Sequence, residues 1–315
     1  MSQDAYPTVA PVRIRGAHAV QTVERTGNVA VRTAVVTEAD AGLAIVAEGL
    51  APSSQRHAQQ CAELVLESCR QIFRGRSANI LDELAEVWWL GEHGEENAAG
   101  VRRARRPYTT LPIADRVELR ERIAALLERR TADSMGDVAA LEAETASLLA
   151  IPDRALRRAA SDIYRYAEGN REWRHAAASA ACAIFAAGRI ATAHLGGVRI
   201  VRIRDGEIET IASEHTIRNA VKQEHPDLSE RQIADVPAEA FTKMLGMSDE
   251  IGPEVTSSAV LSGDVFVLTN NAANLRFSRM EILTAVRARG LGAAEYLAKR
   301  GIDAPPVALT VVEVL

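Results

Sequence analysis

The chain has 315 residues, of which 47% are apolar and 25% are charged, and its formal net charge is -5. This is the composition of an ordinary folded protein, and it excludes collagen-like, coiled-coil and disordered classes. The excess of acidic residues gives no electrostatic basis for nucleic-acid binding, so we expect no nucleic-acid partner.

The first fifty residues show the pattern of antiparallel strands. Short β-branched runs are separated by Gly16, Gly27 and polar residues, and the run Ala41–Val46 is apolar enough for a buried strand. A helix is expected from about Gln55 to Phe73, because apolar residues recur there at three- and four-residue steps.

Residues 81–149 differ in amino-acid composition from the chain on either side. They are rich in Ala, Glu and Arg, and the apolar residues of Ile113–Thr131 predict an amphipathic helix. We therefore expect a helical insertion over 81–149 within a single domain that spans residues 1–315. The basic run over 102–106 is typical of a solvated linker, and a contact with an acidic or phosphorylated protein is the alternative.

A second group of strand patterns follows a helix expected over about 152–168. One hairpin is predicted around Ala187-Gly188 and another around Asp205-Gly206, which is a strong hairpin dipeptide. Strands are also expected over Val260–Leu268 and Val307–Val314, with helices between and after them. Strands, helices and strands in this order favour an α+β class over regular βαβ alternation.

Seven short segments outside the insertion form an ordered series of motifs. Two lie near the N-terminus: RTGNVA (25–30) and AIVAEG (44–49). Five lie in the second half: AHLGGVR (193–199), RDGE (204–207), SEHT (213–216), FTKMLG (241–246) and LSGDVFVLTNN (261–271). In order and spacing they resemble R-x-x-N-E-D, V-A-D-G, G-D-S-R, r-d-G, D-H-s, l-t-r-a-L-G and G-D-x-l-L-L-c-S-D-G of the bacterial PPM/PP2C-type metal-dependent serine/threonine phosphatases.

The resemblance implies an αββα sandwich, in which two antiparallel sheets lie face to face with helices outside each. For an active member it also implies two Mg²⁺ or Mn²⁺ ions held by aspartates, with a bridging water that attacks the phosphate. Such hard cations need carboxylate oxygens, and the water becomes a nucleophile near neutral pH only when they polarise it. The aspartates are therefore the part of the motifs that catalysis cannot lose.

Several aspartates of the resembled motifs are replaced by neutral residues. Ala30 stands at the aspartate of N-E-D, Gly197 at that of G-D-S-R, and Asn271 at that of S-D-G. Loss of even an outer partner of a metal ligand costs about 10–100-fold in metal affinity or activity. Because three carboxylates are lost here, we expect no tightly bound metal pair, and weakly bound Mn²⁺ or Mg²⁺ is the alternative.

The residual metal-ligand candidates are few. Glu48 replaces the aspartate of V-A-D-G with a longer carboxylate, and Gly49 keeps the glycine whose carbonyl is a metal ligand in the family. Asn271 offers an amide oxygen. Asp303 is the candidate for the C-terminal D-N-x-T aspartate, although an alignment through Thr310 would shift that position.

Arg25 stands where the family keeps its phosphate-binding arginine. An arginine fork holds a phosphate without a metal, so Arg25 is a candidate phosphate-binding residue. The alternative is that an arginine stands there by chance in an arginine-rich chain.

Three functions follow from these motifs. The favoured one is a catalytically inactive pseudophosphatase, with no catalytic residues, that acts as a regulatory protein-binding module for a kinase or phosphoprotein. The second is a weak serine/threonine phosphatase that uses Glu48, the Gly49 carbonyl, Asp303 and Asn271 on an altered metal site. The third is an assembly protein that oligomerises through the insertion helices.

Other residues bear on location and on metal chemistry. The three cysteines form no C-x-x-C pair and are odd in number, which favours a reducing compartment. No signal-peptide pattern is present, and Arg189 interrupts the apolar stretch Ala176–Val198, so we expect a cytoplasmic protein without membrane contact. The seven histidines show no metal-ligand spacing, and His194 is expected to be a strand residue of the core or edge.

Overall fold

The computed structural model describes residues 12–20, 29–37, 41–52, 54–74, 94–96, 102–104, 118, 146–147, 149–237, 240–248, 252–300 and 306–315. The chain divides into two compact units. One consists of residues 1–72 and 149–315, and the other of residues 73–148.

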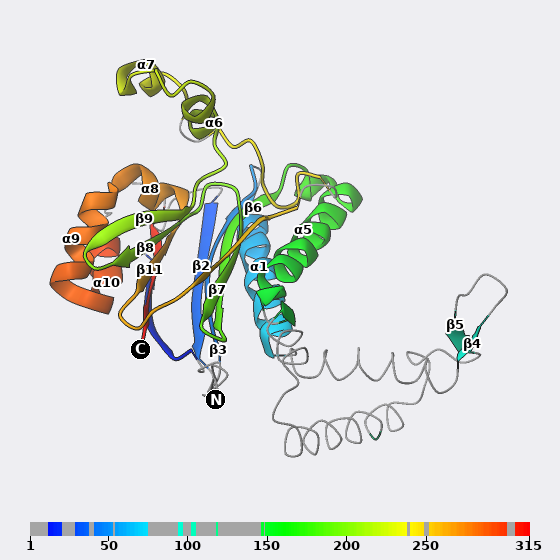
Figure 1. Cartoon of the computed structure of the whole chain (residues 1–315). Coiled ribbons are helices and arrows are strands. Elements are labelled where there is room, and N and C mark those ends of the chain that lie inside the picture. Colours follow the sequence, from blue (N-terminus) through cyan, green and yellow to red (C-terminus); the bar gives the residue numbers. More distant parts are fainter. Residues whose placement is uncertain are drawn as a thin grey trace, which may run out of the picture. The chain divides into compact units, whose positions relative to one another are not determined.

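The larger unit contains two five-stranded antiparallel sheets (Figure 1). The first sheet has the order β1 (Ile14–Val20), β12 (Ala308–Val314), β11 (Val265–Thr269), β8 (Arg199–Arg204), β9 (Glu207–Ala212). The second sheet has the order β10 (Glu254–Ala259), β7 (Arg189–Leu195), β6 (Ala177–Ala186), β3 (Ala41–Leu50), β2 (Val29–Thr37).

The main core lies between the two sheets. Val46 and Phe185 of the second sheet belong to one buried cluster with Phe266, Leu268 and Val312 of the first. The rings of Phe185 and Phe266 meet edge to face, with their centroids 5.3 Å apart. Small and β-branched residues fill most of the remaining space, as the low aromatic content of 4% requires.

Helices cover the outer face of each sheet (Figure 1). The second sheet is covered by α1 (Gln55–Arg74) and α5 (Ile151–Gly169), and the first by α8 (Asn271–Arg276), α9 (Arg279–Arg289) and α10 (Ala293–Lys299). Short 3₁₀ turns lie at Arg171–Trp173 and Gly290–Gly292. Between β9 and β10, a segment with α6 (Ile217–Glu224) and α7 (Glu230–Ala234) extends past the end of the sandwich. The expected αββα sandwich is confirmed.

Both predicted hairpins are confirmed, and their turns have the backbone that their sequences favour. Ala187 and Gly188 have φ values of 50° and 71°, and Asp205 and Gly206 have 50° and 79°. Two consecutive residues with positive φ match the right-handed twist of the flanking strands. The helix expected over 55–73 is also present, with Cys61, Val65 and Cys69 buried along its apolar stripe.

The strand predicted over Val260–Leu268 is present as β11, but it starts only at Val265. Strand β10 ends at Ala259 and β11 starts at Val265, and a tight turn joins them. In that turn Gly263 has a φ of 89°, and the Asp264 carboxylate accepts the Leu261 N–H at 2.9 Å. This side-chain cap and the glycine form a turn over the first residues of the predicted strand, which therefore begins later than its apolar pattern indicated.

The smaller unit is described only in part. Strands β4 (Gly94–Glu96) and β5 (Arg102–Ala104) form an antiparallel pair, so the prediction of helix is wrong there. The Gly- and Asn-containing sequence between them disfavours helix and allows a turn. The remaining predictions for 81–149, including the Ile113–Thr131 helix, lie almost wholly outside the described residues. Among the described residues, no helix is long and apolar enough to cross a bilayer.

Candidate functional site

Glu48 lies near the end of β3, on the inner face of the second sheet. It pairs in register with Val31 of β2 on one side and with Ser179 of β6 on the other. The next row of the sheet consists of Ala30 and Gly49, which are also paired. All of these residues, Gly49 included, are buried, so the Glu48 carboxylate lies inside the sandwich.

The turn between β7 and β8 and the start of α8 approach this row. The Gly197 N–H donates to Ser179 Oγ at 3.0 Å. The Asn271 N–H points at Glu48 Oε2 over 3.4 Å, a long hydrogen bond. The structure therefore brings together five predicted positions, which we call the Glu48 corner: Ala30, Glu48, Gly49, Gly197 and Asn271.

The two glycines of the Glu48 corner are closely packed. A Cβ atom on Gly197 would lie 2.4 Å from Cε1 of Phe241 and 2.8 Å from Cβ of Asn271. The space next to Gly197, where the resembled motif has an aspartate side chain, is therefore taken by an aromatic ring. A Cβ atom on Gly49 would lie 1.9 Å from the Ala58 carbonyl oxygen of α1, so helix packing alone requires this glycine.

The described residues of the Glu48 corner do not fit a pair of divalent cations. They offer one carboxylate, Glu48, and that group already faces the amide of Asn271. Two such ions bring about four positive charges and need several anionic oxygens. A neutral amide and an aromatic edge in place of two carboxylates cannot balance this charge. Arg25 and Asp303 lie outside the described residues.

A second group of ligand-type side chains lies toward the β10 edge of the second sheet, where the strand register puts His194 on the same face as Glu48. His194 of β7, His215 of the segment after β9 and Glu254 of β10 offer ligand atoms that all lie within 4.8 Å of one another. The two imidazole rings are stacked, with centroids 4.7 Å apart and planes 6° apart. Sequence spacing missed this group because its members come from three separate segments.

Hydrogen bonds already engage these side chains. His194 Nε2 lies 3.0 Å from the Ser213 carbonyl oxygen, and His215 Nδ1 accepts the Gly196 N–H at 3.1 Å. His215 Nε2 therefore carries the proton and donates to Glu254 Oε2 at 3.1 Å. The three residues form a candidate site for one metal ion, which would have to replace this last hydrogen bond.

The same contacts set the charges of the group. Burial, and secondly the nearby His215, lower the pKa of His194 despite the opposing effect of Glu254 and two backbone carbonyls. The hydrogen bond from His215 lowers the pKa of Glu254, and burial opposes it. His194 is thus held neutral and Glu254 ionised, which is the form that a metal ion requires of both.

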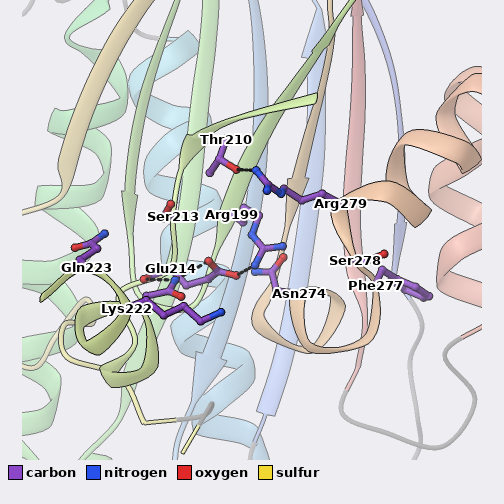
Figure 2. Close-up of a pocket in the computed structure, with 11 residues that line it drawn as sticks. Arg199, Thr210, Ser213, Glu214, Lys222, Gln223, Asn274, Phe277, Ser278 and Arg279 are labelled. Carbon is purple, nitrogen blue, oxygen red and sulfur yellow. Dashed lines mark hydrogen bonds and ion pairs between the residues drawn. The ribbon is translucent and has the colours of Figure 1, made fainter. Parts of the chain in front are cut away.

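A polar pocket of about 630 Å³ opens beside the Glu48 corner. Its walls come from the first sheet, α6 and the start of α9 (Figure 2). We call it the cationic pocket and define it by Arg199, Glu214, Lys222, Asn274 and Arg279. Arg199 and Glu214 fall in the motifs G-D-S-R and D-H-s, whereas sequence analysis did not single out Lys222 or Arg279.

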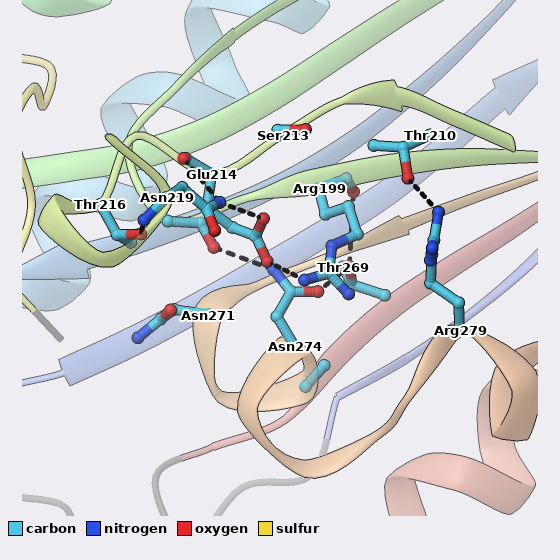
Figure 3. A network of polar contacts seen from close by, with 12 residues as sticks. Arg199, Thr210, Ser213, Glu214, Thr216, Asn219, Thr269, Asn271, Asn274 and Arg279 are labelled. Carbon is cyan, nitrogen blue, oxygen red and sulfur yellow. Dashed lines mark hydrogen bonds and ion pairs between the residues drawn. The ribbon is translucent and has the colours of Figure 1, made fainter. Parts of the chain in front are cut away.

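A hydrogen-bonded network forms the floor of the cationic pocket (Figure 3). The Arg199 guanidinium pairs with Glu214 Oε1, and Asn219 Nδ2 donates to Glu214 Oε2 at 2.9 Å. Asn274 Nδ2 donates to the Gly197 carbonyl at 3.1 Å, which joins the floor to the Glu48 corner. The network fixes the position of the Arg199–Glu214 pair between the two regions.

Comparisons with known proteins bear on the fold. No protein-family model and no curated protein sequence matches the chain. Among solved structures, Stp1 of Staphylococcus aureus matches with a TM-score of 0.63 at 12% identity, over 99% of this chain and 100% of that one. The Mycobacterium tuberculosis phosphatase PstP/Ppp matches with a TM-score of 0.62 at 18% identity, over 96% and 98%.

A structure of the PstP catalytic domain in complex with two manganese ions also matches. Its TM-score is 0.61 at 17% identity, over 96% of this chain and 99% of that one. The three structures are those of serine/threonine phosphatases, and at such identities they establish the architecture alone. This chain has the fold of the bacterial PPM/PP2C-type serine/threonine phosphatases.

Proposed function

We propose that this protein is a catalytically inactive PP2C-like module that binds a phosphorylated protein partner. The observation that carries the proposal is the composition of the Glu48 corner. Asn271 lies beside a single buried carboxylate, Gly197 lies next to Asn271, Ala30 stands in the adjacent row of the sheet, and the Phe241 ring fills the space beside Gly197.

Hydrolysis of a phosphomonoester by this fold depends on a water that two divalent ions activate. Without the carboxylates that hold these ions, no group of the Glu48 corner can lower the pKa of a water to near neutrality. Binding of the phosphorylated partner does not need that step, because guanidinium and ammonium groups bind a phosphate directly.

A phosphatase assay tests the proposal. We expect the full chain, with millimolar Mn²⁺ and p-nitrophenyl phosphate, to release no more product than its Glu48→Gln variant. Glu209→Gln is the matched control, because Glu209 is an exposed carboxylate of the same unit, 58% exposed in its side chain. Turnover that persists in Glu209→Gln and disappears in Glu48→Gln would refute the proposal.

The second candidate is a weak metal-dependent phosphatase with an altered site. Two observations favour it: the buried Glu48 carboxylate beside the Gly49 backbone, and the His194–His215–Glu254 group near the same end of the second sheet. Titration calorimetry with Mn²⁺ separates the candidates. The weak phosphatase predicts binding in the millimolar range that weakens in Glu48→Gln or His215→Ala, and no binding at millimolar Mn²⁺ would exclude it.

A further inference from the structure

The His194–His215–Glu254 group brings together three places in the chain. His194 of β7 and Glu254 of β10 stand opposite each other on neighbouring antiparallel strands, so their side chains leave the same face of the second sheet. His215 comes from the segment after β9, and its backbone N–H donates to the Gly196 carbonyl at 2.8 Å. Strand register and this backbone bond therefore fix the positions from which the three side chains start.

His194 keeps one nitrogen for a cation. Its Nε2 faces the Ser213 carbonyl oxygen, which only accepts, so Nε2 carries the proton and Nδ1 carries a lone pair. That Nδ1 is buried, in a residue that is 1% exposed, and it receives no hydrogen bond from any described residue. Buried polar atoms ordinarily have a partner, and a bound cation would supply one here.

Glu254 supplies a negative charge and access to solvent. Its side chain is 60% exposed, whereas that of His215 is 12% exposed. The group therefore opens to solvent on the Glu254 side, where a water molecule can complete the coordination of an ion. The exposed Lys243 also acts on this carboxylate, and solvent screens its repulsion of a bound cation.

The donor set favours a transition metal over a hard cation. Two imidazoles, one carboxylate and a water form a tetrahedral ligand set of Zn²⁺, whereas Mg²⁺ and Ca²⁺ take oxygen ligands. Tetrahedral Zn²⁺ holds such ligand atoms about 3.4 Å apart. His215 Nε2 and Glu254 Oε2 lie 3.1 Å apart, and all three ligand atoms lie within 4.8 Å of one another. Side-chain rotation closes the remaining distance without movement of the strands.

Binding of an ion exchanges one existing hydrogen bond for another contact. The two rings are parallel to within 6°, so their lone pairs converge only when one ring turns. His215 is the less buried ring. When it turns, its Nε2 binds the ion, its proton moves to Nδ1, and the bond from the Gly196 N–H is lost. Because the present hydrogen bonds hold the group together by themselves, the fold does not depend on the ion, which binds reversibly.

We infer that His194, His215 and Glu254 bind one Zn²⁺ ion, with a water as the fourth ligand. The ion joins β7 to both ends of the segment between β9 and β10, because His215 lies just before α6 and Glu254 begins β10. This inference goes beyond the proposed function and is independent of it, since it uses no residue of the Glu48 corner.

Zinc titration of the untagged full chain tests the site. The chain is treated with a chelator and desalted, and binding of Zn²⁺ and of Mn²⁺ is measured by titration calorimetry. We expect one Zn²⁺ per chain and an affinity for Mn²⁺ that is lower by at least about 100-fold, because imidazole sites bind Zn²⁺ more tightly than Mn²⁺. Co²⁺ serves as a spectroscopic probe, since a tetrahedral nitrogen and oxygen site gives it a strong visible absorption.

Two conservative variants remove one ligand each. Glu254→Gln keeps an acceptor for His215 but loses the charge, and His215→Gln loses an imidazole. Each should lose the Co²⁺ absorption and at least about tenfold in Zn²⁺ affinity, because loss of an outer partner of a ligand already costs this much. Thermal melts in EDTA establish that the variants fold. If His215→Gln does not fold, the exposed Glu254 carries the test.

The matched controls are Glu209→Gln and His225→Gln. Glu209 is a carboxylate with a 58% exposed side chain, close to the 60% of Glu254, and His225 is an exposed histidine of the same segment as His215. Neither belongs to the group, so each control should change the Zn²⁺ affinity by less than twofold.

Three results would overturn the inference: no Zn²⁺ binding by the wild type at about 100 µM, wild-type affinity in Glu254→Gln and His215→Gln, or equal losses in these variants and their controls. Loss of zinc binding in Glu48→Gln alone would place the ion in the Glu48 corner and overturn it as well. Phosphate release with Mn²⁺ is followed separately. An inactive chain that binds no zinc refutes this inference alone, and an active chain that binds zinc through His215 refutes the inactive function alone.

Discussion

The Glu48 corner and the cationic pocket lie side by side and differ in the charge of their motif residues. Both are built from segments that resemble phosphatase motifs. The pocket keeps a buried ion pair, Arg199 with Glu214, whereas the corner has neutral residues at three aspartate positions. The comparison shows two roles of charged residues: some stabilise the fold as ion pairs, and others serve only to bind a metal. Ion-paired groups are costly to lose singly, but clustered carboxylates without a metal repel one another.

The largest loss of stability is expected when a buried charge loses its ion-pair partner. Asp264 is 1% exposed and accepts two hydrogen bonds from Arg204, both at 2.6 Å. Replacing Asp264 with Ala leaves that guanidinium unpaired and uncaps the β10–β11 turn. We expect a loss of about 3 kcal/mol in the free energy of unfolding, measured by urea denaturation.

The control for Asp264→Ala is Glu209→Ala. Glu209 is 58% exposed and pairs with Arg202 at the surface, so its loss should cost about 0.5 kcal/mol or less. Similar losses in the two variants would contradict the view that the Arg204–Asp264 pair holds the fold.

The next largest effect concerns packing in the Glu48 corner. Gly197→Ala forces a methyl group against the Phe241 ring, and overpacking of this kind costs about 1–3 kcal/mol. The cost should fall in a Phe241→Ala background, because the ring is then absent. A double-mutant cycle by thermal denaturation measures this coupling, and purely additive effects would show that Phe241 does not fill the space.

A smaller effect on the free energy of unfolding is expected from a change of pH. Burial lowers the pKa of His194 in the folded state, so between that value and the unfolded pKa of about 6.5 the unfolded chain binds more protons. The free energy of unfolding should therefore fall as the pH falls below about 7, with a slope of at most about 1.4 kcal/mol per pH unit from this group.

The His194→Gln variant should flatten that part of the pH profile. Glu254, which faces the stacked histidines, has a lowered pKa, so its contribution is present above its unfolded pKa of about 4.5 and is lost only in more acidic solution. An unchanged slope between pH 7 and 5.5 in His194→Gln would contradict the assignment.

The smallest effect, a shift of the melting temperature, is expected from removal of metal ions. The Glu48 corner has no cluster of carboxylates among the described residues, so no repulsion arises there when metal is removed. We expect EDTA to change the melting temperature of the full chain by less than about 2 °C, measured by calorimetry. A shift of many degrees would show that a bound ion contributes to folding.

The sequence by itself determined the local structure and the positions of the missing ligands. Asp205-Gly206 specifies its hairpin because these residues adopt positive φ more readily than most others, and the apolar spacing over 55–74 specifies a helix. The motif order predicted Ala30, Gly197 and Asn271 as degenerate site positions, and the structure places Ala30 beside Gly49, Gly197 beside Ser179 and Asn271 beside Glu48. Each of these predictions needs only neighbours along the chain or a known order of motifs.

Only the tertiary structure decided which distant side chains meet. Arg199, Lys222 and Arg279 come from three elements and line one pocket. His194, His215 and Glu254 come from three other segments and lie close together, and no sequence spacing predicts either grouping. The Phe241 ring beside Gly197 likewise comes from a separate segment. Short-range backbone preferences therefore fixed the strands and turns, whereas packing of the two sheets with the segment between β9 and β10 placed the charges that a ligand would meet.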